Sequence, residues 1–253
     1  MSATKVFGHR GWMGSFPENT LLGFKEAINA GVDGLELDVH MTKDGEIVVI
    51  HDDALDRTTD GTGLIRDLTL AEIKKYSAGI NYSTFPNYDG NQWIAERVPT
   101  LQEVLEFLAP YDTELNIELK TFMYPYKGME AKVLSVVEQY GNGRKVIYSS
   151  FHLPSILKIK ALNSSAKIAW ILNQCIPQPK DYLETLQLEA LHLYKGVLLI
   201  HAHQYKDIVE QLRVWTANEN DEIKQLLDLN VNTIITDHPE KALFFRSERN
   251  SFV

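Results

Sequence analysis

Short apolar segments alternate along the chain with longer segments in which apolar residues recur every three or four positions. The short segments have the length and composition of buried strands. They predict nine strands, at residues 5–8, 33–39, 46–51, 115–119, 145–150, 167–172, 190–193, 212–216 and 233–236. Strands that alternate with amphipathic helices are typical of βα units around a parallel sheet.

The longer segments predict the helices that connect these strands. They lie at residues 18–30, 70–75, 101–108, 129–140, 154–162, 180–188, 221–229 and 239–245. Residues 79–98 are rich in Asn, Tyr, Pro and Gly, and we expect a long irregular loop there, of the kind that often carries function. Eight or nine strands fit a single (β/α)8 TIM barrel that spans residues 1–253, with a doubly wound open sheet as the alternative.

Composition narrows the classes of partner. The chain has 253 residues, a net charge of −9 and one cysteine, Cys175. The acidic balance argues against nucleic acid and against docking on anionic lipid, so we expect a small-molecule partner. No signal-peptide core and no apolar run of about 20 residues occur, and no internal disulfide can form. We therefore expect a cytoplasmic protein without integral membrane association; its oligomeric state stays open.

Acidic residues occur within two of the predicted strands. Glu36 and Asp38 are two positions apart and therefore project to the same side, and Glu118 belongs to a similar pattern with Asn116. Like charges on a buried strand are costly unless something neutralises them. Three carboxylates from two strands suit a hard divalent cation, Mg²⁺ or Ca²⁺. The alternative is that Glu36 and Asp38 face solvent on an edge strand.

Two histidines and two cationic residues complete the candidate chemistry. His9 and His51 each follow an apolar strand, and a pair of imidazoles suits general acid–base catalysis. Arg10 and Lys120 are candidate phosphate ligands, because a guanidinium binds phosphate oxygens in pairs and an ammonium acts as a point charge. Their alternative role is ion pairing with the carboxylates.

An ordered set of short motifs covers nearly the whole chain and resembles the glycerophosphodiester phosphodiesterase family. The set comprises His9-Arg10-Gly11, Pro17-Glu18-Asn19-Thr20, Glu36-Leu37-Asp38-Val39, Thr42-Lys43-Asp44-Gly45, His51-Asp52-Asp53, the segment 55–61, Val98-Pro99-Thr100-Leu101, the segment 116–120, Ser150-Phe151, the segment 215–218 and Thr236-Asp237.

The resemblance implies a (β/α)8 barrel that hydrolyses glycerophosphodiesters to glycerol 3-phosphate and an alcohol. It implies that Glu36, Asp38 and Glu118 bind the metal and that His9 and His51 are the acid–base pair. It further implies that Arg10 and Lys120 hold phosphate and that Trp215 forms a pocket wall, although the pattern alone favours a core position for Trp215. Water or the neighbouring glycerol hydroxyl could be the nucleophile.

Several alternatives stand beside this interpretation. A lysophospholipase D-like phosphodiesterase would use the same barrel, and a non-catalytic barrel could bind phosphodiesters without turnover. The pair His201 and His203 has the spacing of an amidohydrolase metal site, but it lies late in the chain, and we interpret both as surface or helix residues. His152 and His238 depart from the family pattern and leave the preferred alcohol open.

Overall fold

The computed structural model describes residues 4–251. Its strands are β1 (Lys5–Gly8), β2 (Gly34–Met41), β3 (Ile47–Val49), β4 (Glu114–Leu119), β5 (Val146–Ser150), β6 (Lys167–Leu172), β7 (Ala190–Tyr194), β8 (Leu212–Trp215) and β9 (Thr233–Thr236). All except β3 are parallel, and β1 pairs with both β9 and β2, which closes an eight-stranded ring. The predicted barrel is therefore confirmed, and the alternative of an open sheet is wrong.

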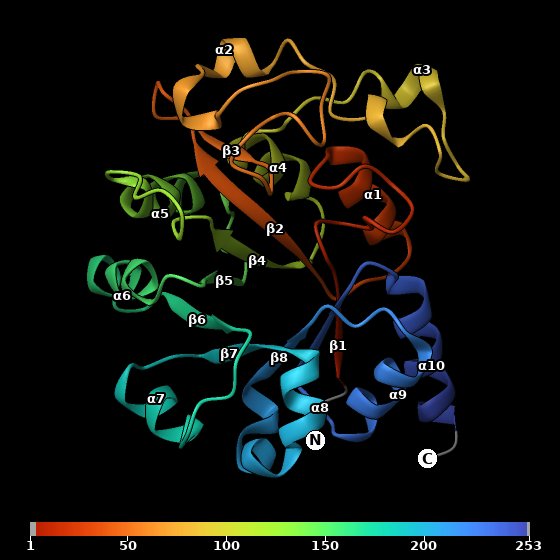
Figure 1. Ribbon diagram of the computed structural model, residues 1–253, viewed down its shortest axis with the longest axis vertical. Coiled ribbons are helices and arrows are strands. Elements are labelled where there is room, and N and C mark those ends of the chain that lie inside the picture. The colour runs from red at the N-terminus through yellow and green to blue at the C-terminus, as the bar shows by residue number, and fades with distance from the viewer. Residues whose placement is uncertain (1–3, 252–253) are drawn as a thin grey trace.

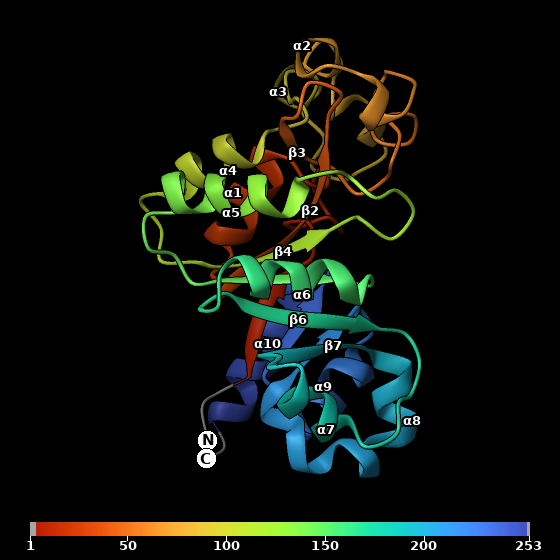
Figure 2. The same cartoon turned by 90° about the vertical axis from the view of Figure 1, so that its left-hand side faces the viewer.

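Most of the helices surround this ring on its outer side, whereas the two short ones at residues 70–73 and 90–93 lie beyond β3, at the top of Figures 1 and 2. The helices are α1 (Leu21–Asn29), α2 (Leu70–Ile73), α3 (Gly90–Trp93), α4 (Leu101–Leu108), α5 (Met129–Tyr140), α6 (Leu153–Leu162), α7 (Pro179–Thr185), α8 (Lys195–Tyr205), α9 (Asn220–Asp228) and α10 (Pro239–Ser251). Three short 3₁₀ segments are η1 (Ile65–Asp67), η2 (Ile80–Tyr82) and η3 (Lys206–Gln211). Apolar side chains of strands and helices form one large core between the two layers. No helix within the described residues has the length and apolar character needed to cross a bilayer.

The first helix begins three residues later than the sequence predicts. The hydroxyl of Thr20 accepts a hydrogen bond from the backbone N–H of Gly23, so Thr20 is the N-cap and α1 starts at Leu21. The backbone of Asn19 has a positive φ of 54°, which a helix does not allow. Glu18 and Asn19 are thereby left outside the helix, and both are buried near the first strands.

The predicted strand at residues 46–51 is not part of the barrel. Only Ile47–Val49 of this segment form a strand, β3, which pairs antiparallel with the end of β2. A turn joins the two strands, and Gly45 in this turn has a φ of 86°. β2 continues two residues beyond its pairing with β4, which ends at Val39. β3 then runs back along β2, and the backbone N–H of Ile50 donates to the carbonyl of Asp38 at 3.0 Å. This reversal brings His51 back to the level of Asp38.

The segment at residues 79–98 is more ordered than the predicted irregular loop. It contains η2 and α3, and it packs with Phe16 and Leu22 into a small apolar core around Trp93, which is 1% exposed. The Trp93 ring packs against Phe16 at 5.7 Å and against Tyr88 at 5.4 Å between centroids. Composition alone did not reveal this core, because its aromatic residues are separated by polar turn residues. The pair His201 and His203 lies within α8, as expected.

The aromatic core of this segment generates a stability prediction. Replacing Trp93 with Ala should lower the free energy of unfolding by about 3–5 kcal/mol, because the cavity cannot be refilled by rigid neighbours. The matched control is Ile94→Ala at the next position, where the side chain is 43% exposed and the change should stay within about 0.5 kcal/mol. Urea unfolding measures both, and equal midpoints for the two variants would refute the packing role of Trp93.

Candidate functional site

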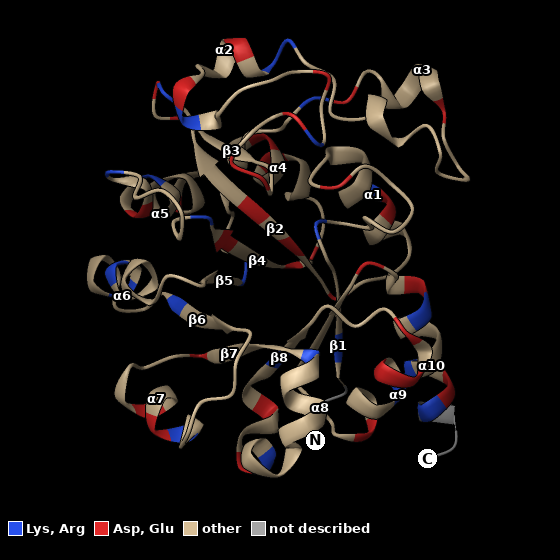
Figure 3. Ribbon diagram, in the orientation of Figure 1, with Lys and Arg blue, Asp and Glu red and all other residues tan. Residues whose placement is uncertain are grey.

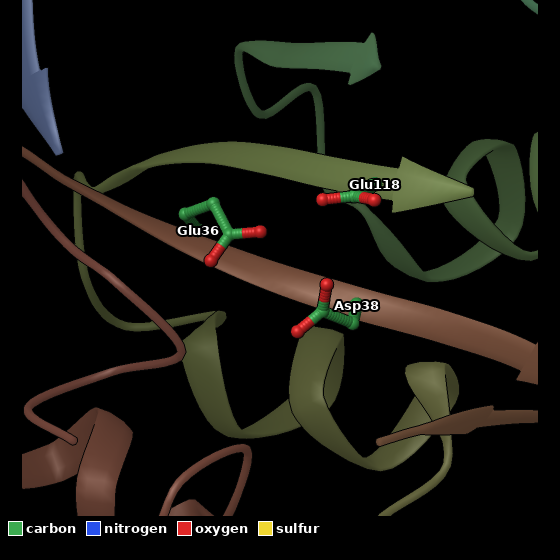
Figure 4. Close-up of side chains that lie close together, drawn as sticks. All are labelled: Glu36, Asp38 and Glu118. Carbon is green, nitrogen blue, oxygen red and sulfur yellow. The ribbon is translucent and has the colours of Figure 1, made fainter. Parts of the chain in front are cut away.

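Three carboxylates from two adjacent strands meet inside the barrel. In the parallel register Glu36 lies beside Asn116 and Asp38 beside Glu118. One oxygen from each of Glu36, Asp38 and Glu118 lies within 4.8 Å of the other two. Figure 4 shows the side chains on β2 and β4 facing the same space. They are 4%, 1% and 9% exposed respectively, so the alternative of a solvent-facing edge strand is wrong.

The electrostatics of this triad depend on nearby cations. Burial raises the pKa of Glu36 well above its usual range, and the charges of Asp38 and Glu118 raise it further. Burial also opposes ionisation of Asp38, but Lys120 and Arg10 lower the pKa of its carboxyl. The three carboxylates therefore exceed the two cations in charge. The pKa is raised at Glu36 and lowered at Asp38.

The donor set suits a divalent cation that prefers oxygen ligands. In addition to the three carboxylates, the side-chain oxygen of Asn116 is buried and accepts no hydrogen bond from any residue that the structure describes. Asn116 lines the same pocket as Glu36 and Glu118. An unsatisfied buried acceptor beside three carboxylates is what a hard-cation site requires, so the residues present fit such an ion.

Arg10 and Lys120 both contact the triad. Arg10 Nε lies 3.3 Å from Asp38 Oδ2, and its backbone N–H donates to Glu36 Oε2 at 3.0 Å. Lys120 Nζ lies 2.8 Å from Glu118 Oε1 and 3.1 Å from Asp38 Oδ1. Although burial opposes both charges, these carboxylates raise the pKa values of Arg10 and Lys120. The predicted ion pairs are therefore present, and both cations also line the pocket.

The imidazole of His9 is held by a carboxylate behind it. His9 Nδ1 donates to Asp237 Oδ1 at 2.6 Å, and the amide of Asn218 donates to Asp237 Oδ2 at 2.6 Å. Burial opposes ionisation of Asp237, but the hydrogen bond from His9 lowers its pKa, so the carboxylate stays charged. With Nδ1 engaged, His9 presents Nε2 to the pocket, 3.9 Å from Glu36 Oε2.

His51 has the same arrangement on a different loop. Its Nδ1 donates to Asp52 Oδ1 at 2.7 Å, and Arg57 Nε donates to Asp52 Oδ2 at 2.7 Å. Arg57 also donates to both oxygens of the buried Glu18, at 2.7 and 2.8 Å. Burial lowers the pKa of His51 below its ordinary value despite the nearby charge of Asp38. Its Nε2 is thus the free nitrogen of a ring that also lines the pocket.

The pocket at the triad has a volume of about 100 Å³ and one apolar side. Trp215 belongs to this side, with ring centroids 5.6 Å from Phe151 and 5.5 Å from Tyr194. Its indole N–H donates to the backbone carbonyl of His192 at 3.0 Å, which holds the ring in place. Trp215 is half-buried and lines the pocket, which agrees with the wall position that the resemblance implies.

The structure places the two residues that depart from the family pattern, His152 and His238, outside the pocket. His152 is the N-cap residue of α6, and its Nδ1 lies 3.0 Å from the hydroxyl of Ser155. His238 lies 3.6 Å from the carboxylate of Glu240 at the start of α10. Neither residue lines the pocket that the triad borders.

Sequence reasoning assigned no role to several residues that support the site. All of them belong to the quoted motifs: Asp237, Asn218, Asp52, Arg57 and Glu18. Except for those of Asp52, which are local, their contacts join separate segments of the chain. The sequence did offer one signal for them. A carboxylate follows His51 directly, at Asp52, and another follows the last strand, at Asp237. His192, buried and with an unpartnered Nε2 among the described residues, gave no signal beyond a polar position in a strand.

Known proteins resemble this chain along almost its full length. It is 38% identical over 242 residues to a glycerophosphodiester phosphodiesterase of Caldanaerobacter subterraneus, covering 95% of this chain and 96% of that protein. It is 37% identical over 254 residues to a glycerophosphodiester phosphodiesterase of Bacillus altitudinis, covering 97% and 99%.

A solved structure has the same fold. An Oleispira antarctica phosphodiesterase, determined in complex with its product sn-glycerol-3-phosphate, superposes with a TM-score of 0.82 at 30% identity and 97% coverage of both chains. The sequence profile of the glycerophosphoryl diester phosphodiesterase family matches residues 9–241, a range that contains the carboxylate triad and both pocket histidines. This chain belongs to the glycerophosphoryl diester phosphodiesterase family.

Proposed function

We propose that this protein hydrolyses glycerophosphodiesters to glycerol 3-phosphate and an alcohol, with the help of one divalent cation. The observation that carries the proposal is a single pocket lined by two triad carboxylates, two cationic side chains and two carboxylate-bound histidines. The third carboxylate, Asp38, lies behind this lining, with one oxygen within 4.8 Å of those of Glu36 and Glu118. The relatives named as glycerophosphodiester phosphodiesterases support the substrate class. The product complex of the Oleispira antarctica enzyme supports glycerol 3-phosphate as the product.

Glu36, Asp38 and Glu118 would hold Mg²⁺ or Ca²⁺. When bound, such an ion draws negative charge from the phosphoryl oxygens. It would also neutralise the triad and lower the pKa of Glu36, which burial and the charges of Asp38 and Glu118 raise. The buried side-chain oxygen of Asn116 would be a further ligand.

Arg10 and Lys120 would hold the phosphate of the substrate. Both stay fully charged beside the triad, and both face the pocket. Arg10 is itself anchored by Glu18, whose oxygen lies 2.9 Å from Arg10 Nη1, so its guanidinium is oriented before substrate arrives. Pre-orientation of this kind reduces the entropy lost when the phosphate binds.

His9 and His51 would transfer the protons. Since Asp237 and Asp52 occupy Nδ1 of the two rings, Nε2 is the exchanging nitrogen in both. One Nε2 accepts the proton of the attacking hydroxyl, and the other donates a proton to the oxygen of the departing alcohol. The apolar wall of Trp215 and Phe151 would face the substituent that leaves.

The metal assignment predicts that activity requires Glu118. Glycerol 3-phosphate release from glycerophosphocholine should occur with Mg²⁺ or Ca²⁺ and stop with chelator. Glu118→Gln should lower kcat/KM on the order of 10²-fold or more, because a Lewis acid contributes several kcal/mol to the transition state. The matched control is Glu184→Gln on α7, whose side chain is 67% exposed and which should keep full activity.

Thermal unfolding of Glu118→Gln controls for the fold, since the variant removes one like charge from the cluster. Full activity of this variant in the presence of chelator would contradict the metal site. Turnover of lysophosphatidylcholine without turnover of glycerophosphocholine would instead favour a lysophospholipase D-type substrate.

The acid–base assignment predicts that His9→Ala and His51→Ala each lower kcat on the order of 10²- to 10⁴-fold. The two losses should differ with a substrate whose leaving group is p-nitrophenolate, because that group departs without a proton. Activity should recover in the variant that lacks the acid and stay low in the variant that lacks the base. His203→Ala on α8 is the control, since this exposed ring lies outside the pocket. Equal recovery in both variants would refute the division of roles.

A further inference from the structure

A second pocket, larger than the one at the triad, lies at the opposite end of the barrel. It has a volume of about 500 Å³ and is bordered by residues at the beginning of strands, including Lys5 of β1, Glu114 of β4 and Lys167 of β6. The triad pocket instead contains residues near the ends of strands, such as Glu118. In Figure 2 β4 and β6 run from left to right, so the two pockets lie at opposite ends of the ring.

This N-terminal pocket is basic although the protein is acidic overall. Five basic and two acidic side chains line it, while the chain as a whole carries a net charge of −9. Figure 3 shows the basic residues at the beginning of β1 and of β6. A basic concavity on an acidic protein concentrates anions from solution.

The two carboxylates of the pocket are already occupied by lysines at its rim. Lys5 Nζ lies 2.6 Å from Glu114 Oε1, and Lys145 Nζ lies 3.5 Å from the same oxygen. Lys167 Nζ lies 2.6 Å from Glu189 Oε1. Neither Glu114 nor Glu189 comes within ion-pair distance of the remaining buried cation, Arg213, although their charges act on it from farther away.

Arg213 is the unusual residue of this pocket. It is only 9% exposed, and its Nη1 is buried without a hydrogen-bond partner. Across residues 4–251 no carboxylate lies within 4.0 Å of its guanidinium, and Cζ lies over the ring of Phe7, 5.1 Å from the centroid. A buried guanidinium without an anionic partner is strongly disfavoured, and a buried donor normally has an acceptor, which the described residues do not supply to Nη1.

We propose that the N-terminal pocket binds the dianion of a phosphate monoester, with Arg213 as its principal ligand. A guanidinium pairs with two phosphate oxygens at once, and the ammonium groups of Lys145 and Lys167 at the rim add point charges. The surplus of basic side chains matches a dianion better than a singly charged carboxylate. The pocket is large enough for a compact organic group on the phosphate, and apolar lining residues such as Leu115 and Ile147 would contact that group. This site does not depend on the proposed hydrolysis.

Calorimetric titration of the Mg²⁺-loaded enzyme tests the proposal, with inorganic phosphate and with glycerol 3-phosphate as separate probes. The wild type should show two binding events with at least one of these probes. Arg213→Gln should weaken one event on the order of tenfold or more, since a charge-assisted pair is lost. The other event and kcat/KM for glycerophosphocholine should stay unchanged. Arg97→Gln, at an exposed arginine elsewhere, is the matched control and should keep both events.

A second variant keeps the proposal testable if the buried substitution prevents folding. Lys145→Gln removes a rim charge whose side chain is 79% exposed, so the fold should be unaffected, and the same event should weaken about threefold to tenfold. A single binding event with both probes in the wild type would overturn the proposal. It would also be overturned if Arg213→Gln folded and kept both events, or if Arg97→Gln weakened binding equally.

Discussion

Three carboxylates buried within 4.8 Å of one another are the constraint on which the architecture of this protein depends. Their mutual repulsion at buried positions opposes folding unless positive charge is supplied. Arg10 and Lys120 supply part of it at 2.8 to 3.3 Å, but burial and the two neighbouring carboxylates still raise the pKa of Glu36. The same imbalance that costs stability makes the cluster a good receptor for a divalent cation.

His51 is connected to this cluster through a continuous chain of charged contacts that begins at Asp52. Asp52 binds Arg57, Arg57 binds Glu18, and Glu18 binds Arg10, which reaches Asp38 of the triad. The loop that carries His51 is therefore anchored to the strand that carries the carboxylates. His9 has a separate anchor in Asp237 and Asn218 from the last strands. Closure of the ring between β9 and β1 places that anchor next to His9.

The two ends of the barrel have opposite charge. Carboxylates gather near the ends of β2 and β4, whereas lysines and Arg213 gather where strands begin. Chemistry at the ends of parallel strands is the rule for this fold, because the βα loops can vary there without disturbing the barrel. The beginning of the strands usually stabilises the fold, and the paired lysines and glutamates there are of that kind. Arg213 is the exception, since its charge is buried without such a partner.

Much of this protein was determined by local sequence. Alternation within Glu36-Leu37-Asp38 places both carboxylates on one side of a strand in any sheet, and the periodic apolar pattern predicted strands that match those of the barrel to within about two residues. The N-cap at Thr20 and the core around Trp93 were harder to predict. At Thr20, a side-chain hydrogen bond to the backbone ends the helical tendency of the residues before it. Around Trp93, packing of aromatic side chains orders a segment whose composition favours a loop.

Only the tertiary structure decided which distant charged side chains contact one another. Asp237 lies 228 positions from His9 and Glu18 lies 39 positions from Arg57, so no local pattern relates them. The return of His51 to the level of Asp38 required β3 to leave the ring and pair antiparallel with β2, although its sequence is equally suited to a barrel strand. The isolation of Arg213 is likewise a property of three-dimensional packing. Sequence determines which groups face the same side of an element, but only closure of the barrel determines which charges meet and which stay alone.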